Sequence, residues 1–168
     1  MRSGFWFGAK RGQPGEQGAI AVEFALILPV LLLLVFGIID FGHAWYMRHM
    51  MSDASREGAR YATRYCTAGT TRILPKDLSP SVTNFILLTS AENGGKGGWG
   101  LQSLLPADAS PAVTPGGPGA TWTSATTVAG KDFIITITAT KTWFVLGNLI
   151  PGLGSSKLLS VTTTMTCE

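Results

Sequence analysis

The sequence predicts an α+β protein in which a long amino-terminal transmembrane helix extends into a head with a small antiparallel sheet. Three observations support this prediction: an apolar run from Ala19 to Ile39, a helical periodicity that continues beyond it without a proline, and β-rich segments near the carboxyl end. A chain of 168 residues is long enough for one small domain and one appendage, and too short for two ordinary domains. Its composition, 45% hydrophobic and 14% charged, lies on the membrane side of the soluble average.

The apolar run is long enough to cross a membrane. Gly18 to Ile39 are 22 residues with one ionisable side chain, and a helix of this length reaches about 33 Å, against roughly 30 Å for the hydrocarbon core of a bilayer. A buried helix of a soluble protein would show a polar stripe, whereas "LILPVLLLLVFGII" is apolar on every side. We therefore predict a leader at residues 1–18 and a transmembrane helix at residues 19–41.

The helix is expected to continue outside the membrane through residues 42–65. Trp45 and Tyr46 fall where an interfacial aromatic belt would lie, and Arg48 falls beyond them in water. Apolar and small residues then recur at helical spacing, namely Met50, Ala54, Gly58, Tyr61 and Ala62. This pattern predicts an amphipathic outer half that the head covers.

The remaining residues, 66–168, are predicted to form the α+β head. The segment from Ser79 to Gly95 fits a helix with Ser79 as its N-cap and Pro80 at its first position, but its β-branched residues also allow a strand. Residues 93–130 are rich in Gly, Pro, Ser and Thr, and we expect loop there with at most short strands.

Two β-rich segments follow. Residues 131–145 alternate between an apolar side and a mostly threonine side, which predicts a half-buried strand. The apolar side holds Phe133, Ile135, Ile137 and Ala139. A connection with turn residues at 148–156 leads to a second β-rich segment at 157–168, and strands joined by a short loop favour an antiparallel pair.

The charge distribution argues against nucleic-acid binding. The formal net charge is +3, but +2 of it lies in the first 18 residues, where Arg2, Lys10 and Arg11 outnumber one glutamate. The remaining residues carry a net charge of only +1. They leave no basic face for phosphate contacts.

Catalytic, metal and cofactor motifs are not found in the sequence. His43 and His49 are six residues apart, off the i, i+4 spacing that would bring two imidazoles onto one metal ion. No serine or cysteine has the context of a nucleophile, and "GGKGGWG" lacks the strand and helix that flank a phosphate-binding loop. We therefore expect neither enzyme activity nor a cofactor, and interpret both histidines as interfacial polar residues.

Glu23 and Pro29 are unusual inside an apolar helix. A carboxylate near the middle of a bilayer costs roughly 2.5 to 3.5 kcal/mol, which makes Glu23 a functional candidate. Because Glu23 lies near the helix start, where the macrodipole favours an anion, a simple position at the membrane interface is the alternative. Pro29 frees the carbonyl of Ala25 and predicts a bend, although prolines are also tolerated in transmembrane helices without a special role.

The residues around Glu23 resemble the class III signal of type IV prepilins. Gly18 follows a short polar leader, and Glu23 is the fifth residue after it, at the start of the long apolar run. In such signals a membrane peptidase cuts after the glycine. The cut would create a cationic amine on Ala19, and Glu23, one helical turn on, would supply the counter-ion within the subunit or in a neighbour.

Two blocks together resemble the TadE-like family of tight-adherence (Flp) pilus systems. The first is "GAIAVEFALILP", and after "GIIDFG" the second is "REGARYA". The matching positions are Gly18, Ala19, Val22, Glu23, Phe24, Ala25, Leu26 and Pro29, then Arg56, Glu57, Gly58, Ala59, Arg60, Tyr61 and Ala62. The resemblance covers residues 18 to about 64 and implies a pilin-like fold and a pseudopilin-like minor subunit that helps pilus assembly or initiation.

The same resemblance implies a location and partners. We expect a single-pass protein of the bacterial cytoplasmic (inner) membrane, with its amino end inside and its head outside the cytoplasm. The expected partners are the lipid bilayer, a prepilin peptidase, and other pilins or pilus assembly proteins. Basic residues lie on both sides of the apolar run, so their count indicates no orientation.

Cys66 and Cys167 would face an oxidising compartment if the head is exported. A bond between them would close a loop of about 100 residues, which corresponds to about 4 to 5 kcal/mol in the chain-entropy model. It would staple the last strand to the end of the long helix. Free thiols or an intermolecular bond are the alternatives.

Two other functions compete with the pseudopilin interpretation. A secreted protein could be cut after Ala44, with Gly42 and Ala44 as small residues, although its apolar run exceeds the usual length of roughly 7 to 15 residues in secretory signals. An unprocessed, membrane-anchored binding module would share the topology of a pseudopilin and differ in what its head contacts.

Overall fold

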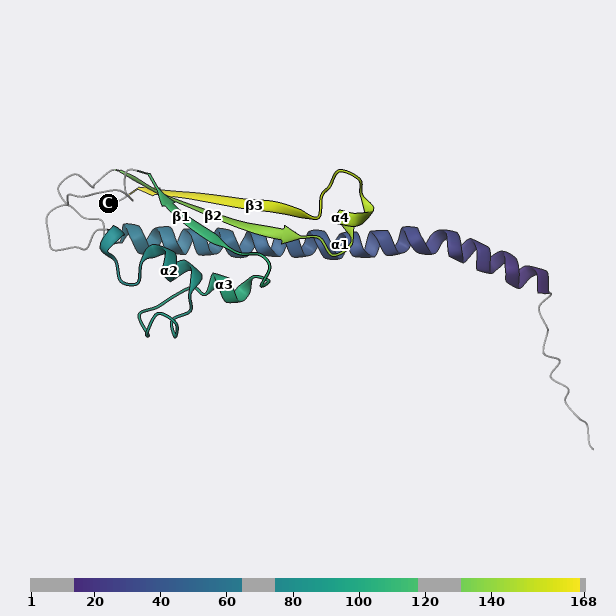
Figure 1. Cartoon of the computed structure of the whole chain (residues 1–168), viewed down its shortest axis with the longest axis horizontal. Coiled ribbons are helices and arrows are strands. Elements are labelled where there is room, and N and C mark those ends of the chain that lie inside the picture. Colours follow the sequence, from purple (N-terminus) through teal and green to yellow (C-terminus); the bar gives the residue numbers. More distant parts are fainter. Residues whose placement is uncertain (1–13, 65–74, 118–130, 167–168) are drawn as a thin grey trace, which may run out of the picture.

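One helix runs through the molecule and carries the head on its carboxyl-terminal half (Figure 1). The computed structural model describes residues 14–64, 75–117 and 131–166. Helix α1 spans Pro14–Thr63, 50 residues, or about 75 Å at 1.5 Å per residue. The predicted α+β class, with a long apolar helix and a small antiparallel sheet, is confirmed.

The sheet has three antiparallel strands in the order β1-β2-β3. They are β1 (Ala112–Gly116), β2 (Asp132–Thr142) and β3 (Ser156–Thr166). The predicted pairing of the last two strands is confirmed, in a register that runs from Asp132 opposite Thr166 to Thr142 opposite Ser156. Strand β1 lies in the region expected to be mostly loop. It pairs with the side of β2 opposite β3 and forms one edge of the sheet. Pro115 is tolerated in β1 because an edge strand leaves some of its amides unpaired.

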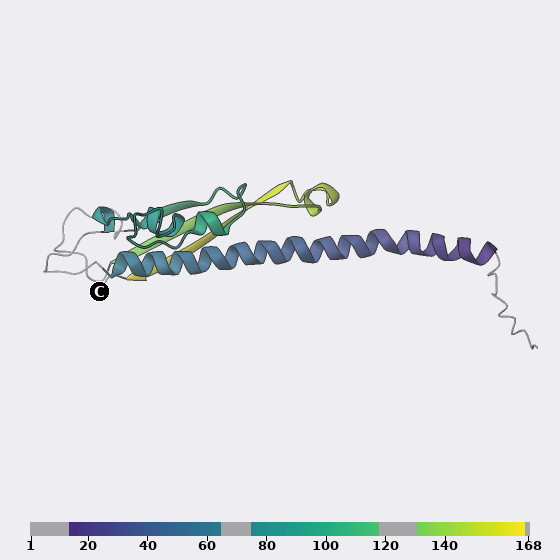
Figure 2. The same cartoon turned by 90° about the horizontal axis from the view of Figure 1, so that it is seen from below.

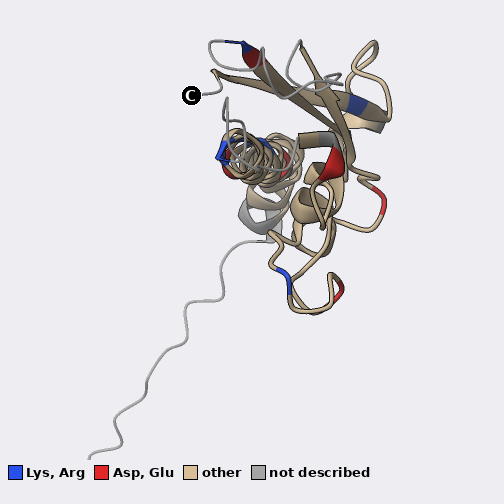
Figure 3. Ribbon diagram, turned by 90° about the vertical axis from the view of Figure 1, so that its left-hand side faces the viewer, with Lys and Arg blue, Asp and Glu red and all other residues tan. Residues whose placement is uncertain are grey.

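The core lies between β2 and one face of α1. The four residues predicted to face inward on β2 are all buried: Phe133, Ile135, Ile137 and Ala139. Opposite them, α1 contributes Met47, Met51, Ala54, Ala59 and Ala62. Figure 2 shows the sheet running alongside the helix, and Figure 3, which looks along α1, shows the head on part of its circumference only.

The ambiguous segment after residue 79 forms a short helix, α2 (Val82–Leu87), followed by α3 (Leu101–Leu104). The predicted N-cap was wrong, because Ser81 rather than Ser79 caps α2, and its hydroxyl accepts the N–H of Asn84 at 3.2 Å. The helix ends at Leu87, well before the predicted glycine stop. Packing decides this outcome, since Val82 and Ile86 turn one face of α2 into the core.

The amino-terminal half of α1 has no protein cover. No side chain from Gly18 to Ile39 is buried. The most apolar stretch of 18 residues in the helix has a mean hydropathy of 2.8, and none of it is buried. In length and composition this part of the chain suits a membrane span. Figure 1 shows α1 bending within this half, which also contains Pro29.

Candidate functional site

The predicted processing residues lie in the first turns of α1. Because α1 begins at Pro14, the peptide bond between Gly18 and Ala19 is inside the helix. Gly18, Ala19 and Glu23 are exposed, and a Cβ built on Gly18 would meet nothing within 4 Å. Ala19 and Glu23, four residues apart, lie on the same helical face. A peptidase would have to unwind the first two turns of α1, at the end of the helix, where fraying is easiest.

The other predicted site residues are placed as follows. Pro29 lies inside α1, which continues through it. Cys66 and Cys167, with the bridge predicted between them, lie outside the described residues. Within the described ranges, no group of three or more His, Cys, Asp or Glu is placed to hold a metal ion.

Asp40, directly after the apolar run, fastens the head to α1. Its side chain is 0% exposed, and its carboxylate accepts three backbone N–H groups from the segment after β2. Phe144 donates to Oδ1 at 3.0 Å, and Val145 and Leu146 donate to Oδ2 at 3.2 and 3.3 Å. The ammonium of Lys141, a residue only 1% exposed, lies 3.4 Å from Oδ1. The buried carboxylate is thus compensated by one cation and three amides.

Aromatic rings surround this ion pair. The Lys141 Nζ atom lies 4.7 Å from the centre of the Phe144 ring and 5.3 Å from that of Trp143. Phe144 stacks on His43 with 5.7 Å between ring centres, and Trp143 meets Phe41 at 5.8 Å. Residues of α1 and of the β2–β3 connection therefore interlock at one level of the helix. His43 takes part in this contact by stacking its ring on Phe144.

Asp40 was not predicted to be a functional residue, although its position in the helical pattern indicates that it lies on the buried face of α1. Asp40 precedes Met47 by seven residues, and Met51 and Ala54 continue the same helical face. All four are buried. A carboxylate on a buried stripe needs a partner in the head. That partner, Lys141, is 101 residues away in sequence, and no local pattern identifies it.

A second carboxylate lies near Lys141. Thr142 donates its hydroxyl to Asp108 Oδ2, and this hydrogen bond, together with the charge of Lys141, lowers the pKa of the Asp108 carboxyl. A lowered folded-state pKa means that the ionised form favours folding, so this contribution is present above the ordinary pKa of Asp and is lost as the pH falls through the folded-state value.

Gly58, in the second block of the family pattern, marks a close approach of α1 to the head. A Cβ at this position would lie 2.5 Å from Ile86 Cγ1 and 3.2 Å from Ile135 Cδ1. Both isoleucines are 0% exposed and have no solvent to move into. The glycine therefore lets α2 and β2 pack onto α1 at the same level.

We expect Gly58→Ala to be less stable than Gly42→Ala by about 1 to 3 kcal/mol, the usual cost of overpacking. Both variants replace a helical glycine of α1 and gain a similar helix propensity of about 0.5 to 1 kcal/mol. A Cβ at Gly42 meets nothing within 4 Å. Thermal unfolding of the full chain in detergent measures the difference, and equal stabilities would mean that Ile86 moves aside without cost.

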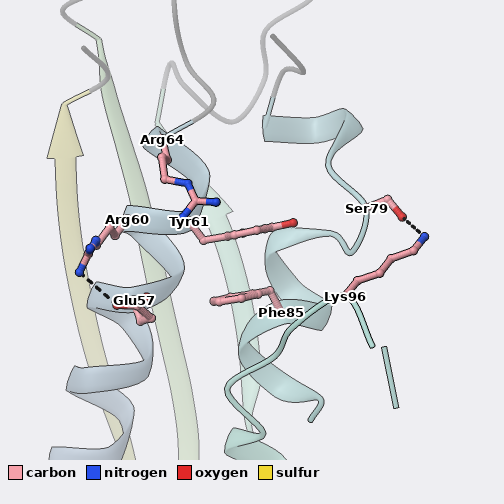
Figure 4. A pocket seen from close by; sticks show the side chains of 7 residues that line it. All are labelled: Glu57, Arg60, Tyr61, Arg64, Ser79, Phe85 and Lys96. Carbon is pink, nitrogen blue, oxygen red and sulfur yellow. Dashed lines mark hydrogen bonds and ion pairs between the residues drawn. The ribbon is translucent and has the colours of Figure 1, made fainter. Parts of the chain in front are cut away.

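A pocket of about 250 Å³ lies near the carboxyl end of α1 (Figure 4). It is lined by Glu57, Arg60, Tyr61, Arg64, Ser79, Phe85 and Lys96. The Tyr61 ring stacks on Phe85 with 4.1 Å between centres, and the Tyr61 hydroxyl donates to the carbonyl of Pro80 at 3.0 Å. This part of the second block therefore joins α1 to the segment around α2.

Comparison with known proteins identifies a family for part of α1. Residues 18–60 match the model of a family described as TadE-like protein, which confirms the resemblance predicted from the two blocks. The match contains the processing block, Asp40 and Gly58, and it ends before the sheet. It implies a protein associated with a Tad pilus. No curated protein and no solved structure matches the chain.

Proposed function

We propose that this chain is a pseudopilin-like minor subunit of a tight-adherence type IV pilus system, cut by a prepilin peptidase after Gly18. One observation carries the proposal: the TadE-like match at residues 18–60 falls on a helix whose amino-terminal half is apolar and uncovered. In this proposal α1 anchors the protein in the bacterial cytoplasmic membrane, with its amino end inside and its head outside.

The division of α1 into an uncovered and a covered half suits a subunit that passes from membrane to assembly. The uncovered side chains would contact lipid before assembly and the helices of other pilins afterwards. The covered half holds the head through Asp40 and the close contact at Gly58. The head would therefore move with its helix as one unit when the subunit joins other pilus components.

Glu23 would neutralise the amine that the cut creates on Ala19. Its position one turn along the helix lets the carboxylate reach that amine, or the amine of a neighbouring subunit, in a medium where an unpaired charge is costly. A pair between neighbours would also set the register of packed helices. Glu23→Ala is therefore expected to leave insertion intact and to impair assembly.

The contacts of Asp40 disfavour a secreted protein that is cut after Ala44. Such a cut would remove Asp40 and leave Lys141, 1% exposed, without its carboxylate. Breaking a buried pair by removing one partner costs about 3 to 5 kcal/mol. The head as folded thus depends on residues that a secretory cut would discard.

The test is the amino-terminal sequence of the protein from a membrane fraction, in cells with and without a prepilin peptidase. We expect a start at Ala19 only when the peptidase is present. Gly18→Val should remain uncut, whereas Gly37→Val should be processed normally. Both glycines lie in α1, and a Cβ at either meets nothing within 4 Å, so only the position relative to the cut differs.

Two other outcomes would replace the proposal. A start after Ala44 with a soluble head would identify a secreted protein. An intact Met1 end in the membrane fraction, in cells that process other prepilins, would identify an unprocessed, membrane-anchored binding module.

A further inference from the structure

The connection between β2 and β3 forms an apolar tip on the head. The hairpin tip, residues 143–155, contains the short helix α4 (Leu146–Leu149). No charged residue lies between Lys141 and Lys157. The tip exposes 67% of Phe144, 50% of Leu149 and 42% of Ile150. Such a group of large apolar side chains at a hairpin end indicates a surface that contacts something other than water.

The hairpin tip lies at the level where the apolar run of α1 ends. Phe144, Val145 and Leu146 donate their amides to Asp40, the first residue after that run, so the tip is held to this point of the helix. Figures 1 and 2 both show α4 beside α1, at the end of the head that faces the uncovered half of the helix.

The exposed apolar surface of the tip continues onto α1. At the same level the helix exposes Ile39, Phe41 and Trp45, and Phe41 contacts Trp143 of the tip. Aromatic side chains gather at the ends of membrane spans because their rings suit the interface between hydrocarbon and water. The helix and the tip together thus present one aromatic and aliphatic zone around the end of the span.

We propose that the hairpin tip is a second membrane contact, in which Phe144, Leu149 and Ile150 enter the lipid of the leaflet next to the head. This inference depends on anchoring by α1 and goes beyond the pilus role. Lys157, exposed on β3 just past the tip, would lie at the level of the lipid phosphates, where the lysine stem covers apolar surface while its ammonium stays hydrated.

The burial of the Asp40–Lys141 pair fits this position. A carboxylate and an ammonium so close to hydrocarbon are costly unless protein encloses them. The backbone amide of Leu146 donates to Asp40, and the rings of Trp143 and Phe144 lie beside the ammonium of Lys141. The tip would therefore shield these charges from lipid while its outer side chains contact the lipid. Continuity with the span favours lipid over a second protein as the occupant of this surface.

The test uses the full chain in phosphatidylcholine and phosphatidylglycerol vesicles at a high lipid-to-protein ratio. An environment-sensitive fluorescent amino acid replaces Ile150, and quenching is compared between a nitroxide on the lipid acyl chain and iodide in the aqueous phase. The matched control carries the same amino acid at Leu104, which is 41% exposed against 42% for Ile150. Leu104 belongs to α3, farther than α4 from the uncovered half of α1 (Figure 1).

We expect the probe at position 150 to lose most of its emission to the acyl-chain nitroxide and little to iodide, with the reverse at position 104. Equal iodide quenching at both positions would overturn the proposal. So would protection of position 150 from both quenchers, which would mean that another protein covers the tip. A probe at Leu33 reports the anchor separately, and if lipid does not quench it, the membrane span fails and the proposed function fails with it.

Discussion

Asp40→Ala is expected to destabilise the folded head by about 3 to 5 kcal/mol, the usual cost of breaking a buried ion pair. The change leaves the ammonium of Lys141 buried without its carboxylate, and it leaves the amides of Phe144, Val145 and Leu146 without their acceptor. Denaturant unfolding of the full chain in detergent, followed by fluorescence, measures the loss. The tip should also become sensitive to limited proteolysis.

Glu57→Ala is the matched control for Asp40→Ala. Glu57 is also an acidic residue of α1 with a cationic partner, but its carboxylate lies 3.9 Å from Arg60 and the two side chains are 43% and 74% exposed. Exposed pairs of this kind contribute about 0 to 1 kcal/mol. Equal losses in Asp40→Ala and Glu57→Ala would contradict a fastening role for Asp40.

A double variant separates the charges from the hydrogen bonds. Asp40→Asn with Lys141→Met removes both charges and keeps one acceptor oxygen for the amides of the tip. It should be more stable than Asp40→Ala, because neither charge is left buried alone. If it is no more stable, the unpaired charge of Lys141 is not what destabilises Asp40→Ala.

Ile135→Ala is expected to lower the free energy of unfolding by about 2 to 5 kcal/mol, through lost burial and the cavity left behind. Ile135 is 0% exposed and lies beside Gly58, where α1, α2 and β2 meet. The surrounding backbone belongs to a long helix and the central strand of the sheet, and both restrict collapse into the cavity.

Ile134→Ala on the same strand is the control for Ile135→Ala. The side chain of Ile134 points to the other face of β2 and is only half-buried. Its loss should cost less than about 1.5 kcal/mol, since part of the removed surface is already in water. Chemical denaturation of both variants in the same detergent gives the comparison. Losses of the same size would show that the second face of β2 is also covered, for example by another copy of the chain.

Local patterns allowed the sequence by itself to determine the long helix, its apolar half and the buried face of β2. Each follows from a pattern within a short stretch of sequence: a continuous apolar run, apolar residues spaced three and four apart, or strict alternation of apolar and polar residues. The processing block at Gly18, Ala19 and Glu23 is equally local, and its role stays a prediction until the amino terminus is sequenced.

Tertiary structure alone decided the features that depend on distant residues. The N-cap of α2 is Ser81 and not the predicted Ser79, because the packing of Val82 and Ile86 in the core sets where that helix begins. Asp40 contacts Lys141 only because β2 runs back along α1 and brings its own end to the middle of the helix (Figure 1). A sequence shows which side chains need a partner, but the partner is chosen by how the chain folds back, and that depends on the packing of the whole core.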